Sequence, residues 1–194
     1  MIQYNIEKLD KKLKKELDHG RYWHSLGVMY TAAALAMQYG CDLNAAMTAG
    51  LLHDCAKCIP NDRKIEMCEK YAIPVSEIEK KAPYLLHSKL GAYLAKTKYG
   101  VEDEEILNAI RWHTTGCPDM TLLEKIIYLA DYIEPTRDFE GLEKLREAAY
   151  TDLDGALILG LEMSLEDLKE RNIVPHSRTN EAINWLYANV RGRD

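Results

Sequence analysis

The stretch Leu51-Leu52-His53-Asp54-Cys55-Ala56-Lys57 closes an apolar helical run with a histidine and an aspartate side by side. Four more positions suited to metal binding lie elsewhere in the chain, at His24, His87, His113 and Asp131. The sequence contains only six histidines, and four of them belong to this set. A lone histidine most often packs in a core or caps a helix. The joint pattern predicts a metal centre instead, because neutral imidazoles and carboxylates bind borderline and hard divalent metals.

Apolar spacing predicts helices along the whole chain. Ile6, Leu9 and Leu13 recur three and four residues apart, as on one face of an amphipathic helix. Gly40 and Pro135 stand where helices should end. The sequence shows no alternating strand pattern, internal repeat or domain linker, so we expect an all-α fold. Further helices are predicted over residues 21–39, 43–57, 63–71, 84–99, 103–112, 121–133, 142–150, 152–171 and 179–190, with a helical turn at 76–81.

The composition is that of a folded protein that binds neither nucleic acid nor membrane. The 194 residues, 47% hydrophobic and 29% charged, can bury a core in one domain. A net charge of −6 disfavours a basic nucleic-acid face, and no apolar run reaches the ~20 residues of a membrane span. The first residues show no signal-peptide pattern. The five cysteines then predict reduced thiols and a cytoplasmic location.

The stretch Cys55-Ala56-Lys57-Cys58 is a CxxC motif, which in other proteins binds zinc or carries redox chemistry. A structural zinc site needs four ligands, and the sequence has no second closely spaced cysteine pair. A thioredoxin-like motif would need a preceding strand, which the pattern does not predict. We therefore expect these cysteines to serve packing.

Three stretches carry a resemblance to a known family: residues 51–57, residues 111–116 (Arg-Trp-His-Thr-Thr-Gly) and residues 130–139 (Ala-Asp-Tyr-Ile-Glu-Pro-Thr-Arg-Asp-Phe). The order His, His-Asp, His, His, Asp resembles the HD-domain superfamily of metal-dependent phosphohydrolases. The three stretches resemble the signatures of its bacterial YqeK family, and the likeness extends over nearly the whole chain. It implies a single HD-type phosphohydrolase domain over residues 1–194, built as a helical bundle of about nine helices.

The resemblance implies a symmetrical bis(5'-nucleosyl)-tetraphosphatase, a phosphoanhydride hydrolase. Such an enzyme cleaves diadenosine tetraphosphate and related dinucleoside polyphosphates into two ADP. The implied cofactor is iron (Fe2+/Fe3+), as one or two ions, with other divalent metals as options. A bound metal lowers the pKa of its water from about 15.7 toward roughly 7, which makes a nucleophile at neutral pH. The implied partner is a small-molecule nucleotide, with a homodimer left open.

The resemblance also assigns roles to individual residues. The implied metal ligands are His24, His53, Asp54 and Asp131. The implied catalytic residues are Asp54, His87 and His113. The expected substrate contacts are Arg21, Lys57, His87, His113, Thr114, Asp131 and Arg137, together with Ile173, Pro175 and His176 of a tail loop expected to close over the nucleoside.

Two alternatives stand beside this interpretation. One is an HD-type phosphohydrolase acting on another nucleotide, such as a nucleoside mono- or triphosphate. The other is a non-catalytic regulatory HD protein that keeps the helical fold without turnover. Loss of ligands would indicate the second, and the sequence lacks none of the expected ligands.

Overall fold

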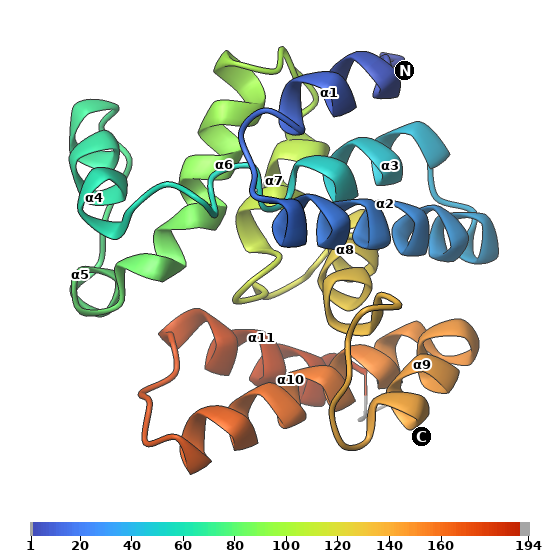
Figure 1. Ribbon diagram of the computed structural model, residues 1–194. Helices are drawn as coiled ribbons and strands as arrows, with labels where there is room; N and C mark the ends of the chain where they lie inside the picture. The colour runs from blue at the N-terminus through green and yellow to red at the C-terminus, as the bar shows by residue number, and fades with distance from the viewer. Residues whose placement is uncertain (1, 191–194) are drawn as a thin grey trace.

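The computed structural model describes residues 2–190, and helices make up all the regular secondary structure in that range. The expectation of an all-α fold is therefore confirmed (Figure 1). The helices are α1 (Ile6–Leu13), α2 (His19–Tyr39), α3 (Leu43–Leu52), α4 (Asn61–Lys70), α5 (Glu77–Lys81), the short 3-10 helix η1 (Pro83–Leu85), α6 (Leu86–Thr97), α7 (Glu104–Trp112), α8 (Leu122–Ile133), α9 (Leu142–Thr151), α10 (Leu153–Glu170) and α11 (Ser177–Asn189).

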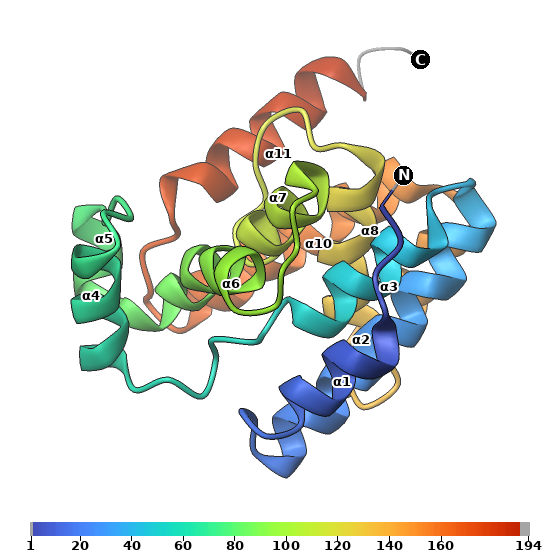
Figure 2. The same cartoon turned by 90° about the horizontal axis from the view of Figure 1, so that it is seen from above.

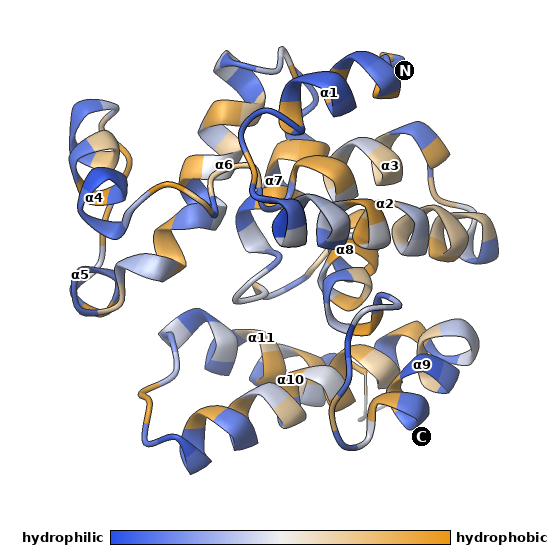
Figure 3. Cartoon of the chain, in the orientation of Figure 1, coloured by the Kyte–Doolittle hydropathy of each residue, from blue (hydrophilic) through white to orange (hydrophobic). Residues whose placement is uncertain are grey.

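Helix α8 lies in the middle of the bundle. Its Ile126, Ile127 and Leu129 side chains are completely buried. Figure 3 shows apolar residues along α7 and α8 and mainly hydrophilic ones on the outlying α4. A capping box between Thr121 and Glu124 fixes the start of α8, since each side chain bonds the other's backbone N–H. The buried start and centre of α8 hold its last turn, which carries Asp131, at a defined place.

Helix α2 packs most extensively against α3, and the contact depends on a glycine. A Cβ added to Gly50 would lie 2.9 Å from the Cα of Met29 and 3.2 Å from the carbonyl oxygen of Val28. Only a residue without a side chain permits two backbones to approach so closely. The close contact brings His53, just past the end of α3, up to His24 on α2.

The remaining helices form two flanks. Helix α10 packs on the central α8 and, with α9 and α11, makes the lower layer of Figure 1. Helices α4 and α5 stand apart on the other side, and α4 is fixed to α6 by a small separate core (Figure 2). That small core consists of Ala56, Cys68, Leu86 and Leu90. None of the helices in residues 2–190 is long and apolar enough to cross a membrane.

Most predicted helix boundaries shift by a residue or two, two departures lie beside the site, and residues 2–190 hold eleven α-helices where about nine were expected. The helix expected over 43–57 ends at Leu52, because the next hydrogen bonds span three residues, from Cys55 N to Leu52 O and from Lys57 N to Asp54 O. The helix expected over 84–99 starts as the 3-10 turn η1 behind Pro83 and runs on as α6. Both departures lie next to the histidines His53 and His87.

The close contact of α2 with α3 predicts opposite effects for two glycine substitutions. Gly50→Ala should destabilise the fold by about 1–3 kcal/mol, because the added methyl group meets backbone that must shift. Gly160→Ala on α10 should stabilise it by about 0.5–1 kcal/mol, because its Cβ would meet nothing closer than 3.7 Å. Thermal melts of both variants test this. Equal melting temperatures for the two would contradict the packing argument.

Candidate metal centre

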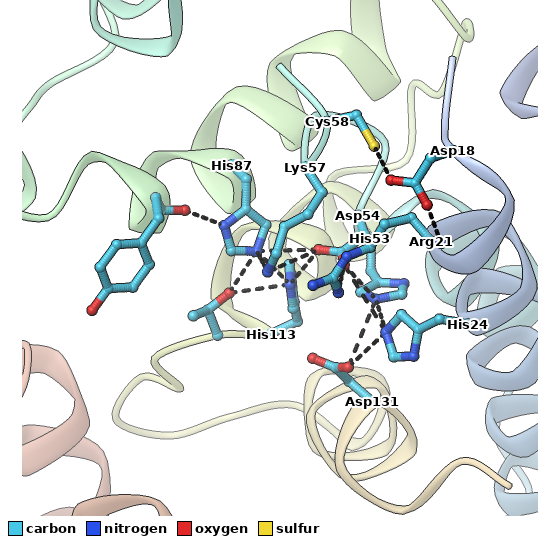
Figure 4. A network of polar contacts seen from close by, with 12 residues as sticks. Asp18, Arg21, His24, His53, Asp54, Lys57, Cys58, His87, His113 and Asp131 are labelled. Atoms are coloured by element: carbon cyan, nitrogen blue, oxygen red, sulfur yellow. Dashed lines mark hydrogen bonds and ion pairs between the residues drawn. The ribbon is translucent and has the colours of Figure 1, made fainter. Parts of the chain in front are cut away.

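Six buried or half-buried side chains from five parts of the chain meet at one point (Figure 4). Each of them was expected from the sequence as a ligand or as a residue lining the site. The set is His24 on α2, His53 and Asp54 after α3, His87 on α6, His113 at the end of α7 and Asp131 on α8. We call this set the histidine cluster.

Three of the four imidazoles are oriented in the same way. In each of them, Nδ1 donates a hydrogen bond to the backbone carbonyl three residues earlier. These bonds run from His53 to Gly50 (2.7 Å), from His87 to Tyr84 (2.6 Å) and from His113 to Ile110 (2.7 Å). With the ring proton on Nδ1, Nε2 carries a lone pair and points into the cluster. This arrangement orients a ring for metal binding.

The fourth imidazole, that of His24, is held by the carboxylate of Glu134. Its Nδ1 lies 3.0 Å from Glu134 Oε1. Glu134 has no exposed surface and also accepts hydrogen bonds from the backbone N–H and the hydroxyl group of Thr136. There is room for this carboxylate because Gly27 has no side chain, and a Cβ there would overlap it. The sequence analysis missed this role of Glu134, because the pair is 110 residues apart.

The Nε2 atoms of the cluster face one another in two close pairs. His24 and His53 are 3.2 Å apart, and His87 and His113 are 3.1 Å apart. Burial lowers the pKa of both His53 and His87 to about 4, so these rings are neutral near neutral pH. Two lone pairs at such distances repel each other unless a cation lies between them or beside them. The donor atoms present therefore fit a metal ion.

Asp54 lies between the two pairs and turns one oxygen to each. Its Oδ1 is 3.2 Å from His87 Nε2 and 3.6 Å from His113 Nε2. Its Oδ2 is 3.7 Å from His53 Nε2 and 4.0 Å from His24 Nε2. Burial opposes ionisation, but the surrounding imidazoles outweigh it and hold the pKa of Asp54 well below its usual range. Oδ1 receives no hydrogen bond from any described residue, which is a further sign of a cation ligand.

Asp131 completes the first pair and is itself held by Arg137. Its Oδ1 is 3.0 Å from His24 Nε2 and 3.8 Å from His53 Nε2. Arg137 donates from Nη2 to this oxygen (2.6 Å) and from Nε to the backbone carbonyl of Asp131 (2.8 Å). Burial raises the pKa of Asp131, but His24, His53 and Arg137 outweigh it and keep the carboxyl group ionised. Arg137 thus lies at the cluster, where it orients the Asp131 carboxylate.

Other expected substrate contacts form a polar rim around Asp54 and His87. Arg21 Nη1 lies 3.4 Å from Asp54 Oδ2, and Lys57 Nζ lies 3.5 Å from Oδ1 and 3.1 Å from His87 Nε2. The Thr114 hydroxyl group is 3.1 Å from Nε2 of both His87 and His113. These groups are able to donate to anionic oxygens bound at the cluster.

The tail loop leads into α11. His176 begins α11, where its Nδ1 accepts the backbone N–H of Arg178 at 3.2 Å, and its Nε2 is 3.8 Å from Glu79. Within residues 2–190, no hydrogen bond or ion pair joins Ile173, Pro175 or His176 to the histidine cluster. His176 thus caps α11, and the expected contact of these three residues with the nucleoside stays a prediction.

The cysteines of the CxxC motif stay apart from the cluster. Cys55 is buried and donates to the carbonyl group of Gly91 at 3.5 Å, whereas Cys58 is exposed and contacts Asp18 at 3.3 Å. Both are free thiols. The two groups of potential metal ligands found in residues 2–190 contain only histidine and aspartate.

Comparison with known proteins identifies the family. The HD domain family matches residues 21–136. A Bacillus subtilis protein named symmetrical bis(5'-nucleosyl)-tetraphosphatase is 42% identical over 174 residues, which cover 90% of this chain and 93% of that protein. A protein of the same name from Halalkalibacterium halodurans is 46% identical over 160 residues, which cover 82% of this chain and 85% of that protein.

A solved structure agrees with this assignment. A Clostridium acetobutylicum protein, described as a predicted HD superfamily hydrolase involved in NAD metabolism, is 43% identical and superposes with a TM-score of 0.92. The match covers 96% of this chain and 99% of that one. The chain belongs to the HD domain family, in the group that contains the symmetrical bis(5'-nucleosyl)-tetraphosphatases. The resemblance noted from the sequence motifs is confirmed.

The contact between Glu134 and His24 predicts an effect on metal affinity. Glu134→Gln keeps the size of the side chain but removes the charge that strengthens His24 as a ligand. Metal affinity should fall by about 10- to 100-fold, as for other carboxylates that hold a ligating histidine. Titration of the apoprotein with Fe2+ against a competing chelator measures this. Glu143→Gln, on the exposed side of α9, is the control, and the idea fails when both variants bind metal as tightly as the wild type.

Proposed function

We propose that this protein is a metal-dependent hydrolase that cleaves diadenosine tetraphosphate, and related dinucleoside polyphosphates, symmetrically into two ADP. The observation that carries the proposal is the histidine cluster, with four imidazoles and two carboxylates in mutual contact. The chain is also 42% and 46% identical to two proteins named for this activity. A dinucleoside tetraphosphate carries several negative charges, so its cleavage depends on charge screening and on aiming a nucleophile.

We propose His24, His53, Asp54 and Asp131 as metal ligands, with iron (Fe2+/Fe3+) as the metal. The nitrogen and oxygen donors suit iron and also other divalent metals. Asp54, with one oxygen toward each imidazole pair, supports two ions rather than one, because His87 and His113 then serve as ligands of the second. When bound, the metal supplies Lewis acidity and an activated water.

The protein's own residues would hold the phosphate chain. Lys57 and Thr114 face the His87 pair, and Arg21 faces Asp54 from the other side. Arg137 becomes a phosphate ligand by turning its second Nη toward the substrate while keeping its bond to Asp131. The charge that builds on phosphate oxygens is thus met by positive groups on several sides.

The reaction balances as a hydrolysis. A water oxygen bonds to the second phosphorus from one adenosine, and the bond from that phosphorus to the central bridging oxygen breaks. The bridging oxygen leaves with the other ADP, and the water releases a proton. We assign catalytic roles in this step to Asp54, His87 and His113, since they lie together at the centre of the cluster. Attack at this phosphorus is the cut that gives two identical diphosphates.

The two alternative functions are not favoured. An enzyme for nucleoside mono- or triphosphates would not explain why relatives matched over most of their length are named tetraphosphatases. A non-catalytic HD protein would have lost ligands, whereas all six side chains of the cluster converge here.

Several narrower expectations remain proposals. We propose a cytoplasmic enzyme that acts as a single HD-type domain over residues 1–194, of which residues 1 and 191–194 lie outside the described range. We also propose a homodimer. Trp23, Tyr30 and Met37 support it, since they leave an apolar stripe exposed on one face of α2 at seven-residue intervals. We propose as well that the tail residues Ile173, Pro175 and His176 contact the nucleoside.

Product analysis tests the function. Protein purified without oxygen should convert diadenosine tetraphosphate to ADP alone, and Asp54→Ala should remove turnover and most of the bound metal. Cys58→Ser is the matched control and should keep both, because this thiol lies outside the cluster. Chromatography of the products decides the outcome. Formation of ATP and AMP, or of tripolyphosphate from a nucleoside triphosphate, would contradict the proposal.

A further inference from the structure

A cavity of about 800 Å³ opens beside the histidine cluster, within the usual size range of small-molecule sites. At one end it is lined by residues of the cluster and its rim, namely His113, Thr114, Asp131 and Arg137. The rest of its wall is of a different kind, aromatic and acidic. That wall is formed by Tyr128, Tyr132, Phe139, Glu140, Met163, Ser164, Glu166, Asp167 and Glu170.

Two helix faces build this cavity. On α8, Tyr128, Asp131 and Tyr132 are spaced i, i+3 and i+4, so a metal ligand and two aromatic rings share one face. On α10, Met163 and Glu170 are seven residues apart and also share a face. The loop after α8 adds Phe139. Because Asp131 shares this face of α8 with Tyr128 and Tyr132, a ligand bound at Asp131 lies beside the aromatic wall.

The rings of the aromatic wall pack against one another in a defined geometry, and two of them leave part of their surface exposed. Tyr128 is 2% exposed and stacks on Tyr132, with ring centroids 6.0 Å apart and an angle of 11° between the planes. Tyr132 meets Phe139 edge to face, at 5.5 Å and 81°. Tyr132 and Phe139 are only half-buried and line the cavity. A flat ring can therefore pack on a preformed aromatic surface, and the buried Tyr128 holds that surface in place.

The charge of the cavity changes from one end to the other. Arg137 is bonded to Asp131 at the cluster end, and Glu166 and Glu170 lie on α10. Asp167 also lies there, but it pairs with Arg171 at 2.9 Å. Phosphates are therefore attracted to the cluster and repelled from α10. An elongated ligand with an anionic end and an uncharged aromatic end fits in one orientation only.

We propose that this cavity is a nucleoside subsite, in which the purine base of one nucleoside 5'-diphosphate half lies against Tyr132 and Phe139. Its diphosphate then reaches the cluster end. The inference rests on the proposed function for the identity of the ligand, and it names specificity residues that the sequence motifs did not assign. It places this base on α8 and the loop behind it.

Equilibrium binding of two probes tests the subsite. ADP and inorganic pyrophosphate share the diphosphate, but only ADP has a base. In calorimetric titrations of the metal-loaded protein, Phe139→Leu should weaken ADP binding by about tenfold, the effect of losing one stacked base. Pyrophosphate binding should stay within about twofold, since its contacts lie at the cluster end. Tyr150→Leu is the control, because this aromatic residue lies on α9 outside the cavity.

The outcomes separate the subsite from the proposed function. An ADP affinity unchanged by Phe139→Leu, or an equal loss for ADP and pyrophosphate, overturns the subsite even if diadenosine tetraphosphate is cleaved into two ADP. A selective loss of ADP binding supports it even if that substrate is not cleaved. Melting curves check the fold. Should Phe139→Leu melt early, Tyr132→Leu provides the same comparison on α8, with the same two outcomes.

Discussion

The central constraint on the structure is the repulsion between imidazole lone pairs that the fold holds close together. Backbone carbonyls hold the Nδ1 protons of His53, His87 and His113, and the Glu134 carboxylate holds that of His24. The Nε2 atoms then point into the cluster, at one another and at the carboxylates of Asp54 and Asp131. Burial keeps His53 and His87 neutral, whereas for His24 burial is outweighed by the carboxylates of Asp131 and Glu134, which raise the pKa. A bound cation would be held by the lone pairs of the cluster, which couples metal binding to the shape of the site.

The rest of the fold serves this arrangement. Gly50 lets α3 approach α2 closely enough to bring His53 to His24, and the same residue offers the carbonyl that orients the His53 ring. Gly27 leaves the space that the Glu134 carboxylate occupies. The buried start and centre of α8 fix its last turn, from which Asp131 faces the cluster and Tyr132 faces the adjoining cavity. One rigid helix, α8, therefore contributes side chains to both the metal site and the cavity.

Many of the helices and the residues of the cluster could be predicted from the local sequence, but several contacts within the fold could not. Apolar periodicity and helix-ending residues predict the helices, and histidines that follow apolar runs predict the cluster. The early end of α3 depends on three-residue hydrogen bonds beyond Leu52, which the apolar run does not reveal. The role of Glu134 depends on a contact with a residue 110 positions away. The capping of α11 by the His176 ring was likewise not predicted from the sequence. Such contacts arise from packing rather than from periodicity.

The most direct test of the account is the number of metal ions per chain. Asp54 lies between two imidazole pairs, so anaerobically purified protein should contain about two ions, the number used by dinuclear hydrolytic centres. Joint replacement of His87 and His113 by alanine should reduce this to about one, held by His24, His53, Asp54 and Asp131. Elemental analysis of both proteins gives the answer. A single ion in the wild-type protein, unaffected by the double replacement, would contradict the claim that both pairs are metal ligands.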